Sequence, residues 1–260
     1  MAHLTPGQVE RIATALHEAT CNGTTVAPPT DSHPSMDSDD GYAIQRRLVE
    51  RLGSRHLGYK LGFTSAAMRE QMGVQEPNFG LLLAQHETAR VIPPGRFVHP
   101  RVEPEIALVT CATLRGTDCT LHETMAAVGS VHAALEIVDT RYHEYRFRAP
   151  DNIADNSSAA GFVLGPPLAP GQLDRLRLTG VLLSRNGQPV DHGVGANALG
   201  DPLAALQWLV QRLATEAAVL PAGSLVLTGG LTRAHSLEPG DVLQAEFGDG
   251  MGTVSAARAA

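Results

Sequence analysis

The fold class is decided by the segment RVEPEIALV, residues 101–109, which has the pattern of a β-strand. Side chains alternate between the two faces of a strand. Alternation therefore sends Val102 and Ile106 to one face, and Glu103 and Glu105 project together from the other. The segment predicts a sheet strand with one apolar face and one face that carries two carboxylates.

Two neighbouring carboxylates repel each other unless a positive charge lies between them. Carboxylate oxygens are hard ligands that suit Mg²⁺ or Mn²⁺. The run AALEIVD, residues 133–139, adds Glu136 in the middle of a second apolar strand, where an ionised carboxylate needs a cation or partner to offset its desolvation. Acidic residues on strands are most often solvated, however. The pattern alone leaves both a metal site and an exposed strand face open.

Around these strands, short apolar runs separated by Gly and Pro begin at about residue 97 and predict a sheet-dominated body. Asn186-Gly187 suits the positive φ of a type I′ hairpin turn, and Pro239-Gly240-Asp241 marks another turn. Two helices should interrupt the strands. A capping box of Thr120 and Glu123 predicts one up to about His132, and Asp201-Pro202 predicts the start of the other.

Helical signals dominate the preceding part of the chain. Pro6 opens a segment with apolar residues at helical spacing, and Asp39 or Asp40 can cap a second helix that ends at Gly53. A third, short helix should run from near Thr64 to Gly73, and the polar segment 22–37 reads as a loop. The sequence therefore predicts an α+β protein, with an N-terminal portion over 1–90 and a β-rich domain over 91–260.

Composition is that of an ordinary globular protein: 260 residues, 43% hydrophobic and 18% charged. The 20 Lys and Arg residues are scattered among 27 Asp and Glu, giving a net charge of −7 that argues against nucleic acid as a partner. No 18 apolar residues run together, so we expect no membrane span. Three cysteines without a CxxC pair are expected to be bystander thiols in a cytoplasmic protein.

Two further features are candidates for chemistry. Lys60 is a lone cation in a glycine-flanked apolar strand, where it could orient an anionic substrate or move a proton, although a surface lysine gives the same pattern. Thr228-Gly229-Gly230 could present backbone N–H groups and a hydroxyl to a carboxylate, or form only a tight turn. The histidines lack zinc-site spacing, and the P-loop, Rossmann and Gly-x-Ser-x-Gly signatures are missing.

Taken together, these features resemble the hydratase and decarboxylase branch of the fumarylacetoacetate hydrolase superfamily, namely the 2-oxopent-4-enoate hydratases and 4-oxalocrotonate decarboxylases of aromatic meta-cleavage pathways. The resemblance spans most of the chain and keeps the order of the motifs. The segments that carry it are DGYAIQ (40–45), GYKLGFTS (58–65), EPNFG (76–80), the Glu-x-Glu strand, LEIVDTR (135–141), IADNSS (153–158) and PGD (239–241).

The resemblance implies a fold and a set of site residues. The fold is a mixed β-sheet roll of the fumarylacetoacetate hydrolase C-terminal type with a small N-terminal α/β portion. The implied Mg²⁺ ligands, with Mn²⁺ as an alternative ion, are Glu103, Glu105 and Glu136. Lys60 is the implied catalytic or substrate-orienting residue. The residues expected to line the substrate pocket are Ser158, Thr228, Gly229 and Asn78.

The implied function is that of a metal-dependent lyase acting on a 2-oxo acid through a metal-bound dienolate. Decarboxylation of 2-oxo-3-hexenedioate (4-oxalocrotonate) is the main expectation, and hydration of 2-hydroxypenta-2,4-dienoate is the alternative. Hydratases of the branch typically carry Asp where this chain has Asn78, and an amide cannot act as a general acid or base. The resemblance also implies a homo-oligomer, and a complex between the decarboxylase and its partner hydratase.

Three further expectations concern rival functions and the second carboxylate of the substrate. A carbon-carbon bond hydrolase of the same superfamily ranks below both lyases, because the spacing of His33 and Glu50 matches no hydrolase motif that we recognise. A non-enzymatic binding module would be expected to lack one of the four charged site residues, yet all are present. A second substrate carboxylate could be read by Arg141, Arg146 or Arg148, although surface cations would look the same.

Overall fold

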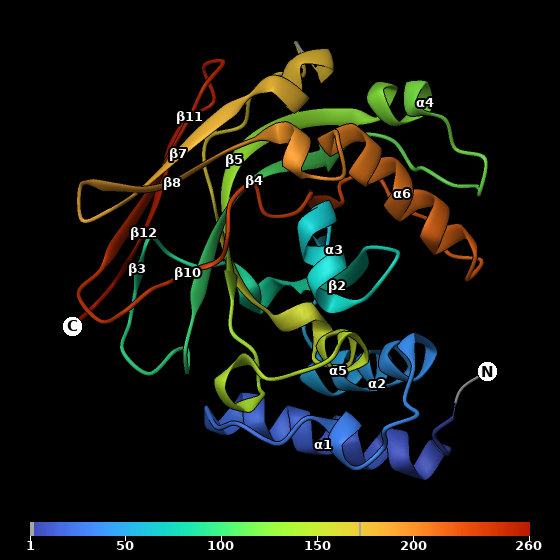
Figure 1. Ribbon diagram of the computed structural model, residues 1–260. Helices are drawn as coiled ribbons and strands as arrows, with labels where there is room; N and C mark the ends of the chain where they lie inside the picture. The colour runs from blue at the N-terminus through green and yellow to red at the C-terminus, as the bar shows by residue number, and fades with distance from the viewer. Residues whose placement is uncertain (1–2, 172) are drawn as a thin grey trace.

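Two β-sheets form the body of the computed structural model, which describes residues 3–171 and 173–260 (Figure 1). A seven-stranded sheet has the order β2-β1-β9-β4-β5-β6, with β10 paired to β4. A five-stranded sheet has the order β3-β12-β11-β7-β8. Their strands are β1 (His56–Gly62), β2 (Asn78–Leu83), β3 (Val91–Ile92), β4 (Arg101–Thr110), β5 (Val128–Val138), β6 (Ala159–Leu164), β7 (Gly180–Arg185), β8 (Gln188–Val194), β9 (Leu225–Leu227), β10 (His235–Ser236), β11 (Val242–Phe247) and β12 (Gly252–Arg258).

Helices cover the seven-stranded sheet at two places. In Figure 1, α1 and α2 lie together at one end with α5 above them, whereas α6 lies beside the opposite part of the sheet. The α-helices are α1 (Pro6–Asn22), α2 (Ser38–Leu52), α3 (Ala66–Met72), α4 (Leu121–Ala126), α5 (Ala149–Ala154) and α6 (Pro202–Ala214). No helix in the described ranges is long and apolar enough to cross a membrane.

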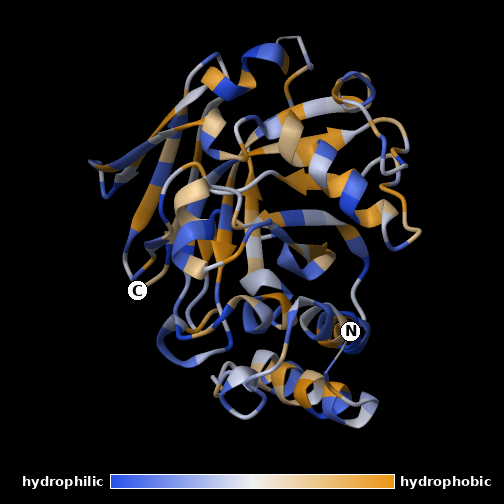
Figure 2. Cartoon of the chain, turned by 45° about the vertical axis from the view of Figure 1, so that its right-hand side comes forward, coloured by the Kyte–Doolittle hydropathy of each residue, from blue (hydrophilic) through white to orange (hydrophobic). Residues whose placement is uncertain are grey.

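The α+β class and the mixed sheet are confirmed. The antiparallel pair of β4 and β5 runs from Arg101↔Val138 to Thr110↔Val128 and forms the middle of the larger sheet. Its apolar residues are buried, and Figure 2 shows hydrophobic colour gathered on the central strands. The Asn186-Gly187 turn joins β7 to β8 as predicted, with φ angles of 51° and 79°. Hydrophobic alternation and turn residues therefore determine where these strands and turns lie in the sequence.

Two predicted helix boundaries are wrong. The cap of α2 is Asp37, which precedes both predicted caps; its carboxylate accepts from the backbone N–H of Asp40 at 3.1 Å. The helix capped by Thr120 ends at Ala126, rather than near His132, because the chain from Val128 onward pairs with β4. Strand pairing that buries a whole apolar segment outweighs a local helical signal.

The segment before residue 90 contributes two strands to the larger sheet. β1 pairs in parallel with β9 and antiparallel with β2, so residues from both predicted portions share one sheet. The helices α1 and α2 have a separate apolar cluster that includes Leu16, Ile44 and Leu48. A division near residue 90 stays a prediction about organisation. What matters for the site is that β1 lies next to β9, which in turn pairs with β4.

Candidate metal centre and its cavity

Three glutamates converge at the middle of the larger sheet. Glu103 on β4 lies directly opposite Glu136 on β5, and Glu105 projects from the same face of β4. One carboxylate oxygen from each of the three lies within 4.8 Å of the others. Glu105 and Glu136 are fully buried. The alternative of an exposed strand face is therefore wrong, and the predicted convergence is confirmed.

These carboxylates lack the partners that buried charges require. Glu105 Oε1 and Glu136 Oε2 have no hydrogen-bond donor within the described residues. Glu136 Oε1 lies 3.1 Å from Lys60 Nζ, close enough for an ion pair but not aligned for a hydrogen bond. Three converging carboxylates, two of which have oxygens without a hydrogen-bond partner, offer the hard ligands that Mg²⁺ or Mn²⁺ binds. The residues present therefore fit a divalent cation.

Burial and mutual repulsion change the protonation of the cluster. Burial, followed by repulsion from Glu136, raises the pKa of Glu103 to about 7. Burial and the charges of Glu136 and Glu103 hold the pKa of Glu105 well above its ordinary value. Burial also raises the pKa of Glu136, although Lys60 acts against it. A bound cation would compete with protons for the same oxygens.

Lys60 is a buried site residue rather than a surface lysine. It lies on β1 opposite Gly80 of β2 and Leu227 of β9, and it is 3% exposed. Its ammonium group donates to the carbonyl oxygen of Ser157 at 3.0 Å. Burial alone would lower the pKa of Lys60, but the three glutamates outweigh burial and raise it. Lys60 therefore brings one fixed positive charge to the carboxylates.

A strained turn forms the part of the cavity wall that contacts Lys60. Asn156, Ser157 and Ser158 all have left-handed backbones, with φ angles of 51°, 54° and 57°. Each such non-glycine conformation has a free-energy cost of about 1 kcal/mol or more and persists only where the surroundings hold it. Here Asn156 holds β2 through hydrogen bonds to both backbone groups of Leu81, and the serines face the cavity. Strain of this kind clusters at functional sites.

Gly229 donates a hydrogen bond to one of the carboxylates, and Thr228 ties the same segment to β4. The backbone N–H of Gly229 donates to Glu105 Oε2 at 2.7 Å. The Thr228 hydroxyl donates to the carbonyl oxygen of Ile106 at 2.8 Å and is fully buried. Gly229 has a φ of 111°, and a Cβ there would collide with the side chain of Thr64, so only glycine fits. A direct contact of these two residues with substrate stays a prediction.

Asn78 begins β2 and joins Ser157 to a residue that the sequence did not single out, Asn152 of α5. Asn78 Oδ1 accepts from Ser157 Oγ at 3.0 Å, and Asn78 Nδ2 donates to Asn152 Oδ1 at 2.9 Å. Asn152 Nδ2 donates to Ser158 Oγ at 3.1 Å. The structure thus brings Asn78 and Ser158 together through Asn152, which lies on the short helix α5 directly before the segment 153–158.

A cavity of about 360 Å³ adjoins the glutamate cluster at Glu103. The charged and polar residues that line it are Lys60, Gln71, Arg101, Glu103, Tyr145, Arg146, Asn152, Ser157 and Ser158. Arg101 was missed, although strand alternation places it on the same face as Glu103. Its guanidinium lies 3.8 Å from the centre of the Tyr145 ring, and the Tyr145 hydroxyl donates to two backbone carbonyls.

The three candidate arginines separate into different roles. Arg146 lines the cavity. Arg141 is buried in an ion pair with Asp155, so its guanidinium is already engaged. Arg148 donates to the carbonyl oxygen of Pro34 and is not among the residues that line this cavity. Of the arginines named from the sequence, only Arg146 is in place to meet a ligand here.

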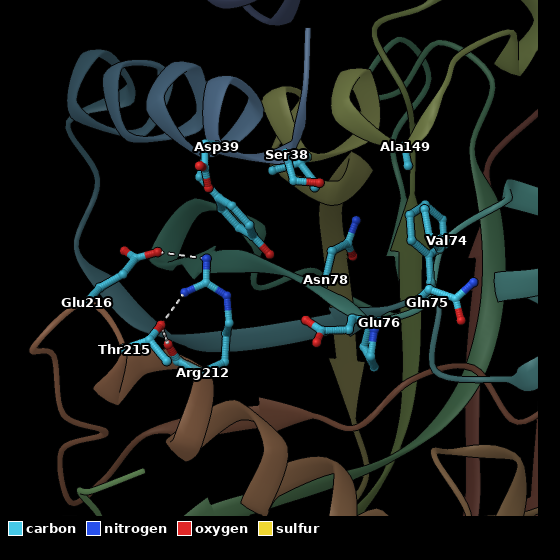
Figure 3. A pocket seen from close by; sticks show the side chains of 14 residues that line it. Ser38, Asp39, Val74, Gln75, Glu76, Asn78, Ala149, Arg212, Thr215 and Glu216 are labelled. Carbon is cyan, nitrogen blue, oxygen red and sulfur yellow. Dashed lines mark hydrogen bonds and ion pairs between the residues drawn. The ribbon is translucent and has the colours of Figure 1, made fainter. Parts of the chain in front are cut away.

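A larger cavity of about 660 Å³ shares the lining residue Phe63 with the first one. Figure 3 shows it bordered by Asn78 and by Arg212, whose guanidinium pairs with Glu216 at 2.9 Å. Asp39 and Glu76 also line it. No three metal-ligating side chains converge there, within the described residues. The candidate metal ligand Glu103 lines the smaller cavity and not the larger one.

Comparison with known proteins identifies the family. A family model described as fumarylacetoacetate (FAA) hydrolase C-terminal matches residues 64–257. A 2-keto-4-pentenoate hydratase of Paraburkholderia xenovorans (strain LB400) is 40% identical over 96% of this chain and 95% of that protein. A 4-oxalocrotonate decarboxylase of Pseudomonas putida is 35% identical over 96% of each.

The structural comparison agrees. The solved structure of 4-oxalocrotonate decarboxylase from Pseudomonas putida G7, complexed with magnesium and adipate, superimposes with a TM-score of 0.94 at 34% identity. The match covers 99% of this chain and 100% of that one. The resemblance seen in the sequence and the predicted fold are both confirmed.

Proposed function

This chain belongs to the fumarylacetoacetate hydrolase family, and on that premise we propose that it is a Mg²⁺-dependent lyase that decarboxylates a 2-oxo dicarboxylic acid such as 2-oxo-3-hexenedioate. Glu103, Glu105 and Glu136 are the proposed metal ligands, with Mn²⁺ as an alternative ion. Support for a divalent cation comes from their unpaired buried oxygens and from the decarboxylase structure that contains magnesium.

The observation that carries the choice of a dicarboxylic substrate is the pair of arginines in the cavity. Arg101 and Arg146 line the same space as Lys60 and Glu103. A cavity that receives only one carboxylate at the metal has no need of two further cations. Arginine binds carboxylates with two parallel hydrogen bonds, so either residue can hold a second carboxylate in one orientation.

Decarboxylation requires little proton transfer by side chains of the protein. When bound, Mg²⁺ supplies positive charge that stabilises negative charge developing at the 2-oxo group. The bond to the distal carboxylate breaks, CO₂ leaves, and its electron pair moves through the conjugated carbons to the 2-oxo oxygen. Lys60 adds a fixed charge at the same end of the cavity, and Arg101 and Arg146 orient the carboxylate that leaves.

Hydration is the second candidate, because a relative 40% identical to this chain is a 2-keto-4-pentenoate hydratase. Adding water to a dienol requires a positioned proton donor and acceptor. Asn78 cannot fill either role, since an amide does not titrate at ordinary pH. The Tyr145 hydroxyl is engaged with the carbonyl oxygens of His99 and Val138. These features favour decarboxylation over hydration.

The test offers purified protein and Mg²⁺ with 2-oxo-3-hexenedioate and, separately, 2-hydroxypenta-2,4-dienoate, followed by ultraviolet absorbance and NMR. We expect CO₂ and the dienoate from the diacid, and no 4-hydroxy-2-oxopentanoate from the dienoate. Hydration of the dienoate without release of CO₂ from the diacid would replace this proposal with the hydratase.

Arginine variants test the substrate class directly. Arg146→Ala should raise KM for the diacid by about 10- to 100-fold, the loss expected for one charged hydrogen-bonded contact. Arg148→Ala is the matched control from the same segment, because Arg148 contacts Pro34 and not the cavity. Equal effects of the two substitutions would argue against recognition of a second carboxylate by Arg146.

The remaining expectations concern assembly and location. We propose a cytoplasmic homo-oligomer that forms a complex with a partner hydratase, as the family resemblance implies. Light scattering on the purified chain, alone and mixed with a 2-oxopent-4-enoate hydratase, tests both associations. A monomer that binds no hydratase would contradict them.

A further inference from the structure

One chain of hydrogen bonds runs around the cavity wall from Lys60 to Ser158. Lys60 Nζ donates to Ser157 Oγ at 3.4 Å, and Ser157 Oγ donates to Asn78 Oδ1 at 3.0 Å. Asn78 Nδ2 donates to Asn152 Oδ1 at 2.9 Å, and Asn152 Nδ2 donates to Ser158 Oγ at 3.1 Å. All five residues are at most 5% exposed. The chain connects side chains from β1, β2, α5 and the left-handed turn.

The direction of this chain is fixed by its first member. An ammonium group only donates, so Ser157 Oγ accepts from Lys60 and turns its own proton toward Asn78 Oδ1 at 3.0 Å. Asn152 Oδ1 is a more distant acceptor for the same proton at 3.4 Å. Asn78 must then present its oxygen to Ser157 and its NH₂ group to Asn152. Asn152 in turn presents its oxygen to Asn78 and its NH₂ group to Ser158. Every member therefore accepts on the Lys60 side and donates on the other.

Ser158 is the last residue in this series of hydrogen bonds, and its hydroxyl proton has not yet been used. Its oxygen accepts from Asn152 Nδ2 at 3.1 Å, and the described residues form no hydrogen bond in which the Ser158 hydroxyl is the donor. Ser158 lines the cavity that contains Lys60 and Glu103. Water in the cavity, or a ligand that displaces it, can accept this hydrogen bond.

Local packing holds this series of hydrogen bonds in place. A Cβ at Gly62 would collide with Asn78 Oδ1 and lie 2.7 Å from Ser157 Oγ, so the absence of a side chain at Gly62 makes room for the contact between them. The left-handed backbone of Ser157 and Ser158 turns both hydroxyls to the same wall. Gly62 and the left-handed backbone at 157–158 therefore both allow the same hydrogen-bonded arrangement of Asn78, Ser157 and Ser158.

We propose that Asn78 and Asn152 are positioning residues that turn the Ser158 hydroxyl into a hydrogen-bond donor toward the 2-oxo acid group of the substrate. The identity of that group rests on the proposed function. Neither asparagine needs to touch the substrate. Asn78 acts through Asn152, and Asn152 acts through Ser158.

According to this proposal, the Ser158 hydroxyl donates to the cavity only when position 78 carries an amide. A carboxylate in Asn78→Asp only accepts, so the NH₂ group of Asn152 would turn toward it and leave the oxygen of Asn152 facing Ser158. The Ser158 hydroxyl would then donate to Asn152 and no longer to the cavity. Asn152→Asp has the same consequence, since its carboxylate accepts from both Asn78 and Ser158.

Isothermal titration calorimetry of oxalate binding at saturating Mg²⁺ tests whether the Ser158 hydroxyl donates to a ligand. This measurement requires no turnover. Oxalate carries the two adjacent oxygen-bearing carbons of a 2-oxo acid head. Ser158→Ala should weaken oxalate binding by about 10- to 100-fold, because a hydrogen bond to a charged group is lost. Asn78→Asp and Asn152→Asp should weaken it by a similar factor.

A double-mutant cycle separates positioning from simple repulsion between the oxalate anion and the new carboxylate at position 78. If Asn78 acts through Ser158, Asn78→Asp has little further effect on oxalate affinity once Ser158 is replaced by alanine. An equal loss in the Ser158→Ala and wild-type backgrounds would overturn the proposal. Asn152→Asp gives the same cycle independently if Asn78→Asp does not fold, which thermal melting will show.

Asn186→Asp in the β7–β8 hairpin is the control for a new carboxylate outside the cavity, and it should leave oxalate affinity unchanged. A wild-type protein that does not bind oxalate with Mg²⁺ would also overturn the proposal. Failure of the decarboxylation assay is a separate result, because oxalate binding requires no reaction of the diacid. The positioning chain and the proposed function can therefore fail independently.

Discussion

Two buried charged clusters in this protein differ in how completely their hydrogen bonds are made. In the first, Glu103, Glu105 and Glu136 share a single lysine, and several carboxylate oxygens have no donor among the described residues. In the second, Arg141 and Asp155 form an ion pair with almost no exposure of either side chain. The comparison distinguishes a site that awaits a ligand from one that only stabilises the fold.

The Arg141–Asp155 cluster is complete within the chain. Arg141 donates to Asp155 through Nε, and to the carbonyl oxygens of Asp139 and Asp155 at 2.7 Å each through its other nitrogens. Asp155 also accepts from the hydroxyl of Thr140 at 2.9 Å. Buried ions tolerate desolvation when partners of this kind surround them. Missing partners in the glutamate cluster therefore point to an ion from outside the chain.

The largest expected effect breaks the first cluster. Glu105→Gln removes one negative ligand and should lower kcat/KM for the diacid by about 1000-fold, because the charge stabilisation supplied by the metal is worth several kcal/mol. The variant should stay folded, since an amide reduces repulsion in the cluster. Steady-state kinetics over a range of Mg²⁺ concentrations, with circular dichroism, measure both. Retained activity with unaltered Mg²⁺ dependence would contradict the metal assignment.

A substitution in the second cluster should lower stability and leave Mg²⁺ binding unchanged, the reverse of the result expected for the first cluster. Arg141→Met leaves the Asp155 carboxylate buried without its cation and should lower the free energy of unfolding by about 3–5 kcal/mol. Urea denaturation measures this loss. Mg²⁺ affinity of the fraction that remains folded should be near that of the wild type. A stable variant with weakened Mg²⁺ binding would remove the contrast between the clusters.

Metal binding sharpens the comparison without any substitution at the second cluster. Mg²⁺ at about 100 times its Kd should raise the free energy of unfolding by about 2.7 kcal/mol, because it binds the folded chain only. Differential scanning fluorimetry with EDTA or Mg²⁺ shows the corresponding rise in Tm. Glu105→Gln should lose most of this rise, whereas Arg148→Ala should keep it.

The smallest effect concerns His86, which is buried near the second cluster. Burial, and then the charges of Arg141 and Arg96, lower the pKa of His86 to about 3. Its Nδ1 accepts from the backbone N–H of Leu83 at 3.3 Å, as a neutral ring can. The unfolded chain takes up a proton near pH 6.5, whereas the folded chain does not.

Stability from neutral His86 is therefore complete above about pH 6.5 and falls by about 1.4 kcal/mol for each pH unit below it, until the folded group titrates. Urea denaturation at pH 7 and pH 5.5 measures this slope. His86→Gln should flatten it by about one proton's contribution. An unchanged slope in the variant would show that His86 is already protonated in the folded chain.

Much of the site follows from local pattern in the sequence. Alternation along residues 101–109 places Glu103 and Glu105 on one face, and the apolar strand around Glu136 indicates a charge in need of a partner. Both features depend on neighbours in the chain, which is why they could be predicted. The same alternation also contained Arg101, which was overlooked.

Other site features depend on contacts between distant segments. Pairing of Glu103 with Glu136 in register, and burial of Lys60 beside them, required β1, β4 and β5 to meet in one sheet. Asn152 lies directly before the motif 153–158 but outside it, and its link to Asn78 spans 74 positions. Likewise, only the folded chain separates Arg146 in the cavity from Arg141 in an ion pair.

Hydrophobic alternation, turns and residue chemistry are local properties, so the fold class and the kinds of residue in the site could be predicted from the amino-acid sequence. It also indicated the family through motifs in a fixed order. Tertiary structure decided which charges are left without partners and which way the Ser158 proton points. Those properties are sums over contacts between separate elements, and no single segment of the chain contains them.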